Sequence, residues 1–188
     1  SLSAHKMYGP KGVGALFIRR RDPRVTLAPQ MRGGGQERGL WSGTLNVPGI
    51  AAFGEACLLA ASEMEAEGVR LRALRDRLWS RLNGELAGVR LNGSAEERLP
   101  GNLNVSFAGV KAHSLTGALT VLAVSTGSAC SSADAGPSRV LESIGVPADL
   151  AAASLRIGLG RFTTQEEVDF AADRIIEAVR RLRRQDLE

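Results

Sequence analysis

The sequence predicts a mixed α/β chain, and three observations predict it. Residues from about 48 to 86 are rich in Ala, Leu, Glu and Arg, which favours one long helix. Short alternating or apolar stretches at 89–92, 103–107 and 155–160 are typical of strands. An amphipathic pattern at 165–182 predicts a second long helix. We therefore expect a long helix that leads into a small α+β domain.

The long helix is predicted by apolar residues that recur close to every 3.6 positions. Pro48 suits its first turn, and Gly68 marks a candidate break or kink. Cys57 falls on the apolar stripe, so we expect it in the core. A helix of this length can link two domains. The predicted stripe consists of Ile50, Phe53, Cys57, Leu58, Ala61, Met64, Leu71, Leu74, Leu78 and Leu82.

The residues before this helix show little helical or strand periodicity. Residues 14–19 are predicted as a short buried strand and 25–27 as another candidate strand, and 29–44 form a long irregular segment. Such a segment is uncommon in a compact chain and is usually functional or interfacial. The hydroxyls of Ser42 and Thr44 suit an anion, or they cap the following helix.

After the strand at 103–107, helices are predicted at 112–123 and 138–144. His113, at the start of the first, suits a cap or a surface position. The last helix opens with a capping box in which Thr163 or Thr164 pairs with Glu166 or Glu167. Its predicted buried positions are Val168, Ala171, Ala172, Ile175, Ile176, Val179 and Leu182.

The composition is that of a globular protein: 188 residues, 44% hydrophobic and 23% charged. The net charge of +4 is modest and comes largely from two arginine clusters, 19–24 and 180–184. Aromatic residues make up only 4%, which argues against a surface that stacks nucleic-acid bases. We interpret the clusters as solvated faces or as docking sites for an acidic partner.

Two cysteines, Cys57 and Cys130, are present without CxxC spacing or a Cys/His cluster, so no zinc site is predicted. Two thiols without a signal peptide indicate a reducing cytoplasm. No apolar run approaches the ~18 residues of a membrane span, so no membrane association is expected. The chain begins at Ser1 inside a motif, and we expect that a longer protein was cut there.

Cys130 lies in Ser125-Thr-Gly-Ser-Ala-Cys-Ser-Ser-Ala-Asp134, where no bulky apolar residue stands within three positions of the sulfur. A core cysteine usually has Leu, Ile, Val or Phe as neighbours. Small hydrogen-bonding residues are instead typical of a loop that could carry a thiol to a reagent. A plain turn that happens to contain a cysteine is the alternative.

Lys6 lies in a second candidate functional segment, Ser3-Ala-His-Lys-Met-Tyr-Gly-Pro-Lys-Gly-Val-Gly14. The glycines allow a ligand to approach the backbone closely, and Ser3 and His5 can bond an anion such as phosphate. A lysine amine whose pKa is lowered becomes a nucleophile toward carbonyl groups. The alternative for Lys6 is an ordinary surface lysine.

Four stretches together resemble one family. Residues 3–14 are similar to the lysine loop of pyridoxal-phosphate enzymes of the aminotransferase fold. Residues 32–44 look like the glycine-rich segment of cysteine desulfurases, and 125–132 resemble the cysteine loop of the NifS/IscS-like group. Residues 155–163 are similar to the strand that carries their substrate-binding arginine. The order and spacing agree along essentially the whole chain.

The resemblance implies a cofactor, pyridoxal 5'-phosphate, and a role for each matched residue. Lys6 would form the Schiff base, within a cofactor-binding segment that also holds Ser3, Ala4 and His5. Thr44 would reach the cofactor phosphate of the neighbouring subunit in a homodimer. Arg156 would bind the substrate α-carboxylate of L-cysteine, as a guanidinium fork does.

Cys130 would then accept the sulfur as a persulfide, releasing L-alanine. The persulfide would pass to an iron–sulfur scaffold or another sulfur acceptor, with Cys130 as a candidate transient ligand of the nascent cluster. Cleavage of a C–S bond needs an electron sink, which a pyridinium ring supplies and side chains do not. No nucleic-acid partner is expected.

The resemblance also implies the fold class, the C-terminal portion of a fold-type-I PLP-dependent transferase. Residues 1–60 would be the tail of the large domain with the start of the linking helix, and 61–188 the small domain. Arg32 and Trp41 depart from the family pattern, which expects His and Arg there. The family holds further cofactor contacts upstream of this segment, so we expect the isolated chain to be inactive.

Two alternatives to a desulfurase stay open. One is a selenocysteine lyase, against which the cysteine loop argues because such an enzyme must discriminate against cysteine. The other is an inactive fragment or interaction module that binds an acidic partner through the arginine clusters. Alanine formation from either amino acid, and binding of pyridoxal phosphate, separate the three.

Overall fold

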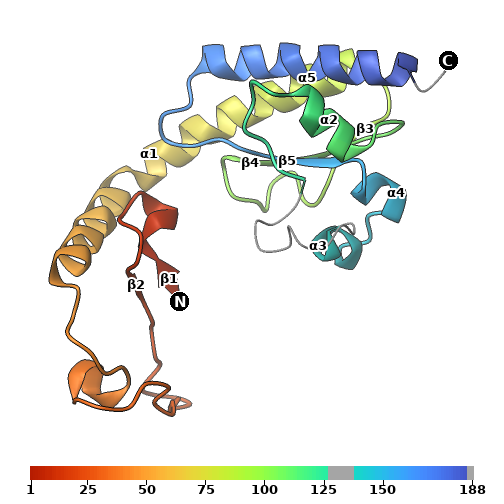
Figure 1. Ribbon diagram of the computed structural model, residues 1–188. Helices are drawn as coiled ribbons and strands as arrows, with labels where there is room; N and C mark the ends of the chain where they lie inside the picture. The colour runs from red at the N-terminus through yellow and green to blue at the C-terminus, as the bar shows by residue number, and fades with distance from the viewer. Residues whose placement is uncertain (127–137, 186–188) are drawn as a thin grey trace. The chain divides into compact units, whose positions relative to one another are not determined.

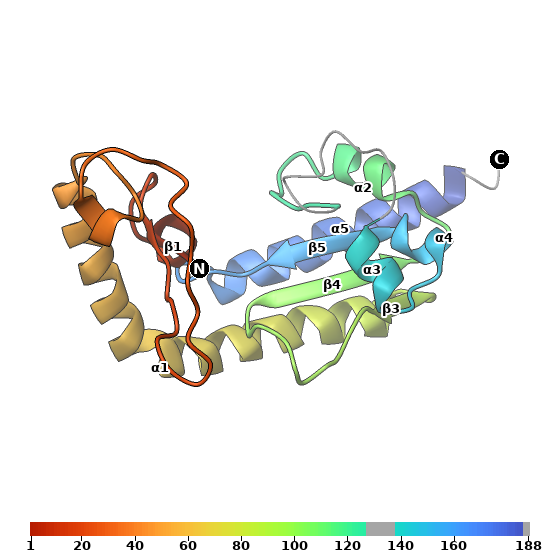
Figure 2. The same ribbon diagram turned by 90° about the horizontal axis from the view of Figure 1, so that it is seen from below.

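A computed structural model describes residues 1–126 and 138–185 and divides the chain into two compact units. The N-terminal unit is Ser1–Glu65 and the C-terminal unit is Ala66–Glu188. Helix α1, Val47–Glu85, runs through the boundary between them. Figures 1 and 2 show the chain from two sides.

The N-terminal unit begins with a two-stranded antiparallel sheet of β1, Leu2–Ser3, and β2, Gly14–Ala15. The short 3-10 helix η1, Ala4–Met7, lies between them, and η2, Gln36–Gly39, follows. The predicted strand at 14–19 is thus two residues long, and no strand forms at 25–27. Within the described part of the unit, residues 16–27 pair with no other strand, and the Val25 amide instead donates to the Arg19 carbonyl at 2.9 Å. The predicted burial of the strand at 14–19 is wrong, because Phe17 is 82% exposed.

Helix α1 is capped by Asn46, whose Oδ1 accepts a hydrogen bond from the Gly49 amide at 3.1 Å. The helix continues without interruption through Gly68, so the predicted break does not occur. A glycine in a helix costs only about 1 kcal/mol, which the other good helix formers of this stretch can offset.

The apolar stripe of α1 is buried only in part, and the prediction that Cys57 lies in the core is wrong. Phe53 and Ala56 are buried, whereas Leu58 and Met64 are more than two-thirds exposed. Helical periodicity identifies an apolar face but not what covers it, and the described N-terminal unit does not cover this one. From Leu71 onward the stripe is buried as predicted.

By length and composition alone, α1 could cross a membrane. This differs from the expectation that no apolar segment is long enough. The stretch is rich in Ala and carries Glu55 and Glu63, which interrupt any continuous apolar run. One such helix is weak evidence, because helices of water-soluble proteins pass the same test.

The C-terminal unit is built on a three-stranded antiparallel sheet in the order β3-β4-β5. The predicted helix at 112–123 ends early, at Ala118, because Leu119 leaves helical backbone angles. The strands are β3, Val89–Leu91, β4, Asn102–Phe107, and β5, Ser154–Gly158; the helices are α2, Ala112–Ala118, α3, Arg139–Ser143, α4, Ala148–Ala151, and α5, Gln165–Gln185.

One face of this sheet packs against α5 and the C-terminal half of α1, which lie along it in both views (Figures 1 and 2). Side chains alternate across a strand, so Leu103, Val105 and Phe107 of β4 all enter this core. From the helices come Leu74, Leu78, Leu82, Val168, Ala172, Ile175, Ile176 and Val179. Of the α5 positions predicted as buried, Ala171 and Leu182 are half-buried and the other five are buried.

The other face of the sheet carries polar side chains. Asn92, Ser106 and Ser154 are each no more than 4% exposed and form one hydrogen-bonded cluster. Ser154 Oγ in turn donates to the Leu150 carbonyl, at 2.7 Å. Because every member has a partner, the cluster avoids the cost of unpaired buried polar groups.

Ion pairs fasten α1 to α5 at the outer edge of the core. Arg77 makes two hydrogen bonds to the Asp169 carboxylate, at 2.6 and 2.9 Å. Arg81 reaches Asp173, at 2.7 Å. The predicted capping box forms between Thr164 and Glu167, with bonds of 2.9 and 3.2 Å. Each helix is therefore positioned by polar contacts as well as by the core.

We predict that replacing Asp169 with Asn makes stability less dependent on pH. The hydrogen bonds from Arg77 hold the pKa of Asp169 below its ordinary value of 3.8. A carboxyl with a lowered native pKa stabilises the fold above its ordinary pKa, and this stabilisation is lost as the pH falls through the native value. The natural chain should exceed Asp169→Asn in unfolding free energy at about pH 6, and the difference should vanish toward about pH 2.

The measurement is urea unfolding across that pH range. Asp149→Asn is the control, because the exposed Asp149 has no ion pair in the described part of the chain. A difference for Asp169→Asn that stays constant with pH would contradict the role of this pair.

Candidate functional site

The lysine segment forms a compact turn between β1 and β2. Ala4 is fully buried and anchors it: its amide donates to the Val13 carbonyl at 3.1 Å, and its carbonyl accepts from the Gly9 amide at 2.9 Å. Gly14 is required because a Cβ there would overlap the Leu2 carbonyl. With Ala4 fixed, the next two side chains, His5 and Lys6, are directed to the exterior.

Three predicted site residues meet on this turn. A hydrogen bond of 3.0 Å joins Ser3 Oγ and His5 Nδ1, and Lys6 follows on the same 3-10 helix with an exposed side chain. Hydroxyl and imidazole groups can bond a phosphate, and an accessible amine can react with an aldehyde. This donor set fits an aldehyde-bearing phosphate ester such as pyridoxal phosphate.

Thr44 lies in the segment that leads to α1 and is exposed. The sequence left open whether Ser42 or Thr44 caps the helix, and the structure gives that role to Asn46. Asn46 stands directly before the helix, and this position could have been recognised from the sequence. Within the described residues the Thr44 hydroxyl makes no hydrogen bond, so it is free to bind a ligand.

Arg156 lies in the middle of β5, on the polar face of the sheet. Its neighbours Leu155 and Ile157 point into the core, so alternation places the exposed Arg156 side chain on the opposite face. No carboxylate of the described residues pairs with its guanidinium. An unpaired guanidinium held on a rigid strand is suited to bind a carboxylate in bidentate geometry.

The segment that leads to Cys130 is joined to the same residue. Ser125 forms an isolated antiparallel bridge with Arg156 along the free edge of β5. The Arg156 amide donates to the Ser125 carbonyl at 2.6 Å, and the Ser125 amide donates to the Arg156 carbonyl at 3.2 Å. Cys130 itself lies outside the described residues. The sequence had not indicated this backbone pairing.

The remaining predicted residues do not extend the site. His113 is exposed in the first turn of α2, which confirms its predicted surface position. Its Nε2 lies 3.3 Å from the Ser114 hydroxyl. Among residues 1–126 and 138–185, no group of three His, Cys, Asp or Glu side chains could hold a metal ion. In the arginine-rich end of α5, Arg180 and Arg183 bond the carbonyls of Glu85 and Ala108. Those two arginines therefore make contacts within the fold, and Arg183 Nη2 is buried without a hydrogen-bond partner among the described residues.

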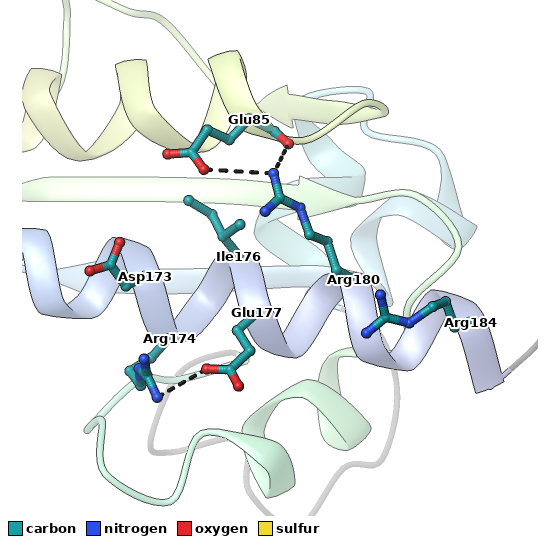
Figure 3. A pocket seen from close by; sticks show the side chains of 7 residues that line it. All are labelled: Glu85, Asp173, Arg174, Ile176, Glu177, Arg180 and Arg184. Atoms are coloured by element: carbon teal, nitrogen blue, oxygen red, sulfur yellow. Dashed lines mark hydrogen bonds and ion pairs between the residues drawn. The ribbon is translucent and has the colours of Figure 1, made fainter.

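A shallow pocket of about 250 Å³ lies between the ends of α1 and α5 (Figure 3). Two arginines of the cluster at 180–184 line it, but none of the predicted catalytic or cofactor-binding residues does. Its charged side chains largely pair with one another, as Arg180 does with Glu85 and Arg174 with Glu177. Its lining is Glu85, Asp173, Arg174, Ile176, Glu177, Arg180 and Arg184.

The chain is similar to known proteins along most of its length. The family model of aminotransferase class-V matches residues 1–170. That match covers most of the chain, and the chain belongs to this family.

Among curated proteins, the chain is 58% identical over 183 residues to cysteine desulfurase IscS of Anaeromyxobacter dehalogenans, covering 97% of this chain and 45% of that protein. It is 52% identical to the mitochondrial cysteine desulfurase of Arabidopsis thaliana, over 97% of this chain and 40% of that one. The chain thus spans less than half the length of these relatives.

Solved structures agree on the fold. A NifS-like protein superposes with a TM-score of 0.81 at 36% identity, over 95% of this chain and 45% of that one. DndA from Streptomyces lividans superposes with a TM-score of 0.64 at 37% identity, over 83% and 44%. The fold is therefore a portion of a NifS-like, fold-type-I transferase.

We predict that Ser125→Pro removes one of the two bonds that hold this segment to β5, since proline has no amide hydrogen. The Arg156 amide, whose acceptor is the Ser125 carbonyl, should then exchange with solvent at least about tenfold faster. Hydrogen exchange monitored by NMR measures it. The Ile157 amide, in the β4–β5 pairing, is the control and should keep its protection. Unchanged exchange at Arg156 would contradict the bridge.

Proposed function

We propose that the protein to which this chain belongs is a pyridoxal-phosphate-dependent cysteine desulfurase, which converts L-cysteine to L-alanine and carries the sulfur as a persulfide on Cys130. The observation that carries the proposal is the bridge between Ser125 and Arg156. It joins the start of the cysteine segment to the strand that holds the candidate carboxylate-binding arginine. The curated names of the similar proteins support the same reaction.

The residues have distinct roles in this proposal. Lys6 supplies the amine that holds the cofactor, and Ser3, His5 and Thr44 bind its phosphate. When bound, pyridoxal phosphate supplies the electron sink that cleavage of a C–S bond requires. Lys6 also moves protons to and from the substrate carbon, because an amine can be both acid and base.

Arg156 orients the substrate by its carboxylate, and Cys130 receives its sulfur. The Cys130 thiolate forms a bond with the substrate sulfur as the C–S bond breaks, and protonation of the carbon gives L-alanine. Cys130 is five positions after Ser125 in the sequence, and five extended residue steps span at most about 18 Å. Binding of substrate at Arg156 therefore brings its sulfur within the range that the covalent chain permits.

The wider setting belongs to the same proposal. The sulfur acceptor is an iron–sulfur scaffold or another acceptor protein, the enzyme is a cytoplasmic homodimer, and Thr44 serves the partner subunit's cofactor. The exposed Thr44 hydroxyl supports this arrangement. So does the exposed apolar surface of the N-terminal unit, where Phe17 and Trp41 are 82% and 56% exposed.

We predict that Cys130→Ser in the complete enzyme abolishes persulfide and sulfide formation but keeps the visible absorbance of the bound cofactor. The hydroxyl cannot accept sulfur, and Cys130 plays no part in holding the cofactor. Cys57→Ser, at the exposed cysteine of α1, is the matched control and should stay active. Lys6→Ala should lose the cofactor absorbance instead.

Alanine, sulfide and cofactor absorbance are measured on the four proteins with L-cysteine and with L-selenocysteine. Sulfur release by Cys130→Ser would overturn the role of the thiol. Turnover of selenocysteine alone would overturn the desulfurase in favour of a selenocysteine lyase.

We also predict that Arg156→Ala mainly raises the KM for L-cysteine, because the lost contact is made in the bound ground state. Hydrogen bonds to charged groups contribute about 1.5–3 kcal/mol, which corresponds to a rise of about ten- to a hundredfold. Arg90→Ala, at an exposed arginine of β3, is the control. Steady-state kinetics decide, and an unchanged KM in Arg156→Ala would exclude a carboxylate contact.

A further inference from the structure

The residue that faces Arg156 across the sheet is Asn104. The two are paired in register between β4 and β5, which lie side by side (Figure 2). Residues directly opposite each other in an antiparallel pair have Cβ atoms about 5 Å apart and project from the same face. The amide of Asn104 and the guanidinium of Arg156 therefore share one patch of the polar face.

Hydrogen bonds from Asn92 hold the side chain of Asn104 in one orientation. Asn92 Nδ2 donates to Asn104 Oδ1 at 2.8 Å, and the Asn92 amide donates to the Asn104 carbonyl at 2.9 Å. Asn92 is itself 4% exposed and fixed by Ser106 and Ser154, at 2.8 and 3.0 Å. A buried and fully bonded partner of this kind restricts the rotation of the Asn104 amide.

This orientation leaves a donor unused. Because Oδ1 of Asn104 is engaged by Asn92, the planar amide directs its Nδ2 away from the cluster. Within the described residues neither Asn104 Nδ2 nor the Arg156 guanidinium has an acceptor, and Asn104 is half-buried. Two adjacent sets of free N–H donors, one charged and one neutral, suit the two oxygens of a carboxylate.

We propose that Asn104 is a second substrate-recognition residue, whose Nδ2 donates a hydrogen bond to the carboxylate that Arg156 binds, with Asn92 as the positioning residue that aims it. The proposal rests on the proposed function, because it takes the amino-acid substrate from there. Asn104 adds a directional bond beside the charge of Arg156, so that a carboxylate-bearing substrate is favoured over the corresponding simple amine.

The test compares L-cysteine with cysteamine, which is the same molecule without the carboxylate. Both are titrated into the complete enzyme with cofactor bound, in the Cys130→Ser background so that sulfur is not transferred, and Kd is read from the cofactor absorbance. Asn104→Ala should raise the Kd for L-cysteine about tenfold or more and leave the Kd for cysteamine unchanged. Asn102→Ala, two residues along β4 and opposite Gly158, is the control and should change neither.

Each possible outcome supports or overturns the proposed role of Asn104. Equal weakening of both ligands would assign Asn104 a structural role and overturn the proposal, and so would an unchanged Kd for L-cysteine. If Asn104→Ala lowers the melting temperature too far for titration, Asn104→Ser, which is too short to reach the carboxylate, is judged by the same criterion. If the parent binds neither ligand, the desulfurase assignment fails and the role of Asn104 with it.

Discussion

The antiparallel pairing of β4 with β5 is the constraint on which the C-terminal unit depends. Strict alternation along both strands divides the sheet into an apolar face, which buries Val105 and Leu155 against the helices, and a polar face. A register shift of one residue would turn Arg156 into the core and Leu155 to the exterior. The packing that stabilises the unit therefore also exposes the residue to which we assign substrate binding.

The contacts around β5 serve both stability and the site. The edge of β5 that does not face β4 pairs with Ser125. The loop after the strand is attached to α1 by Arg70, which donates hydrogen bonds to the Arg161 and Thr163 carbonyls at 2.6 and 2.8 Å. Arg161 in turn pairs with Glu67, at 2.9 Å. With an edge and an end fixed in this way, Arg156 projects from a rigid strand, as precise recognition of a small substrate requires.

Local patterns in the sequence were sufficient wherever the covering surface lies within the same unit. The buried positions of α5 and the strands β3 and β4 could be predicted because periodicity identifies the apolar face that the fold then buries. The capping box at Thr164 could be predicted from the residue types at its two ends. The prediction that Cys57 lies in the core was wrong because periodicity does not show whether anything covers the apolar face of α1. The contacts of Ser125 and Asn104 with β5 could not be predicted, since register between distant segments leaves no mark in either segment alone.

We propose that Arg156, Lys6 and Cys130 serve one reaction on one amino acid. This proposal is tested most directly by a single turnover, in which the complete protein with pyridoxal phosphate receives less than one equivalent of L-cysteine. Alanine is then quantified, and the peptide that contains Cys130 is weighed by mass spectrometry. We expect as much persulfide on Cys130 as alanine released. Alanine without added sulfur on that peptide, or no alanine at all, would contradict it.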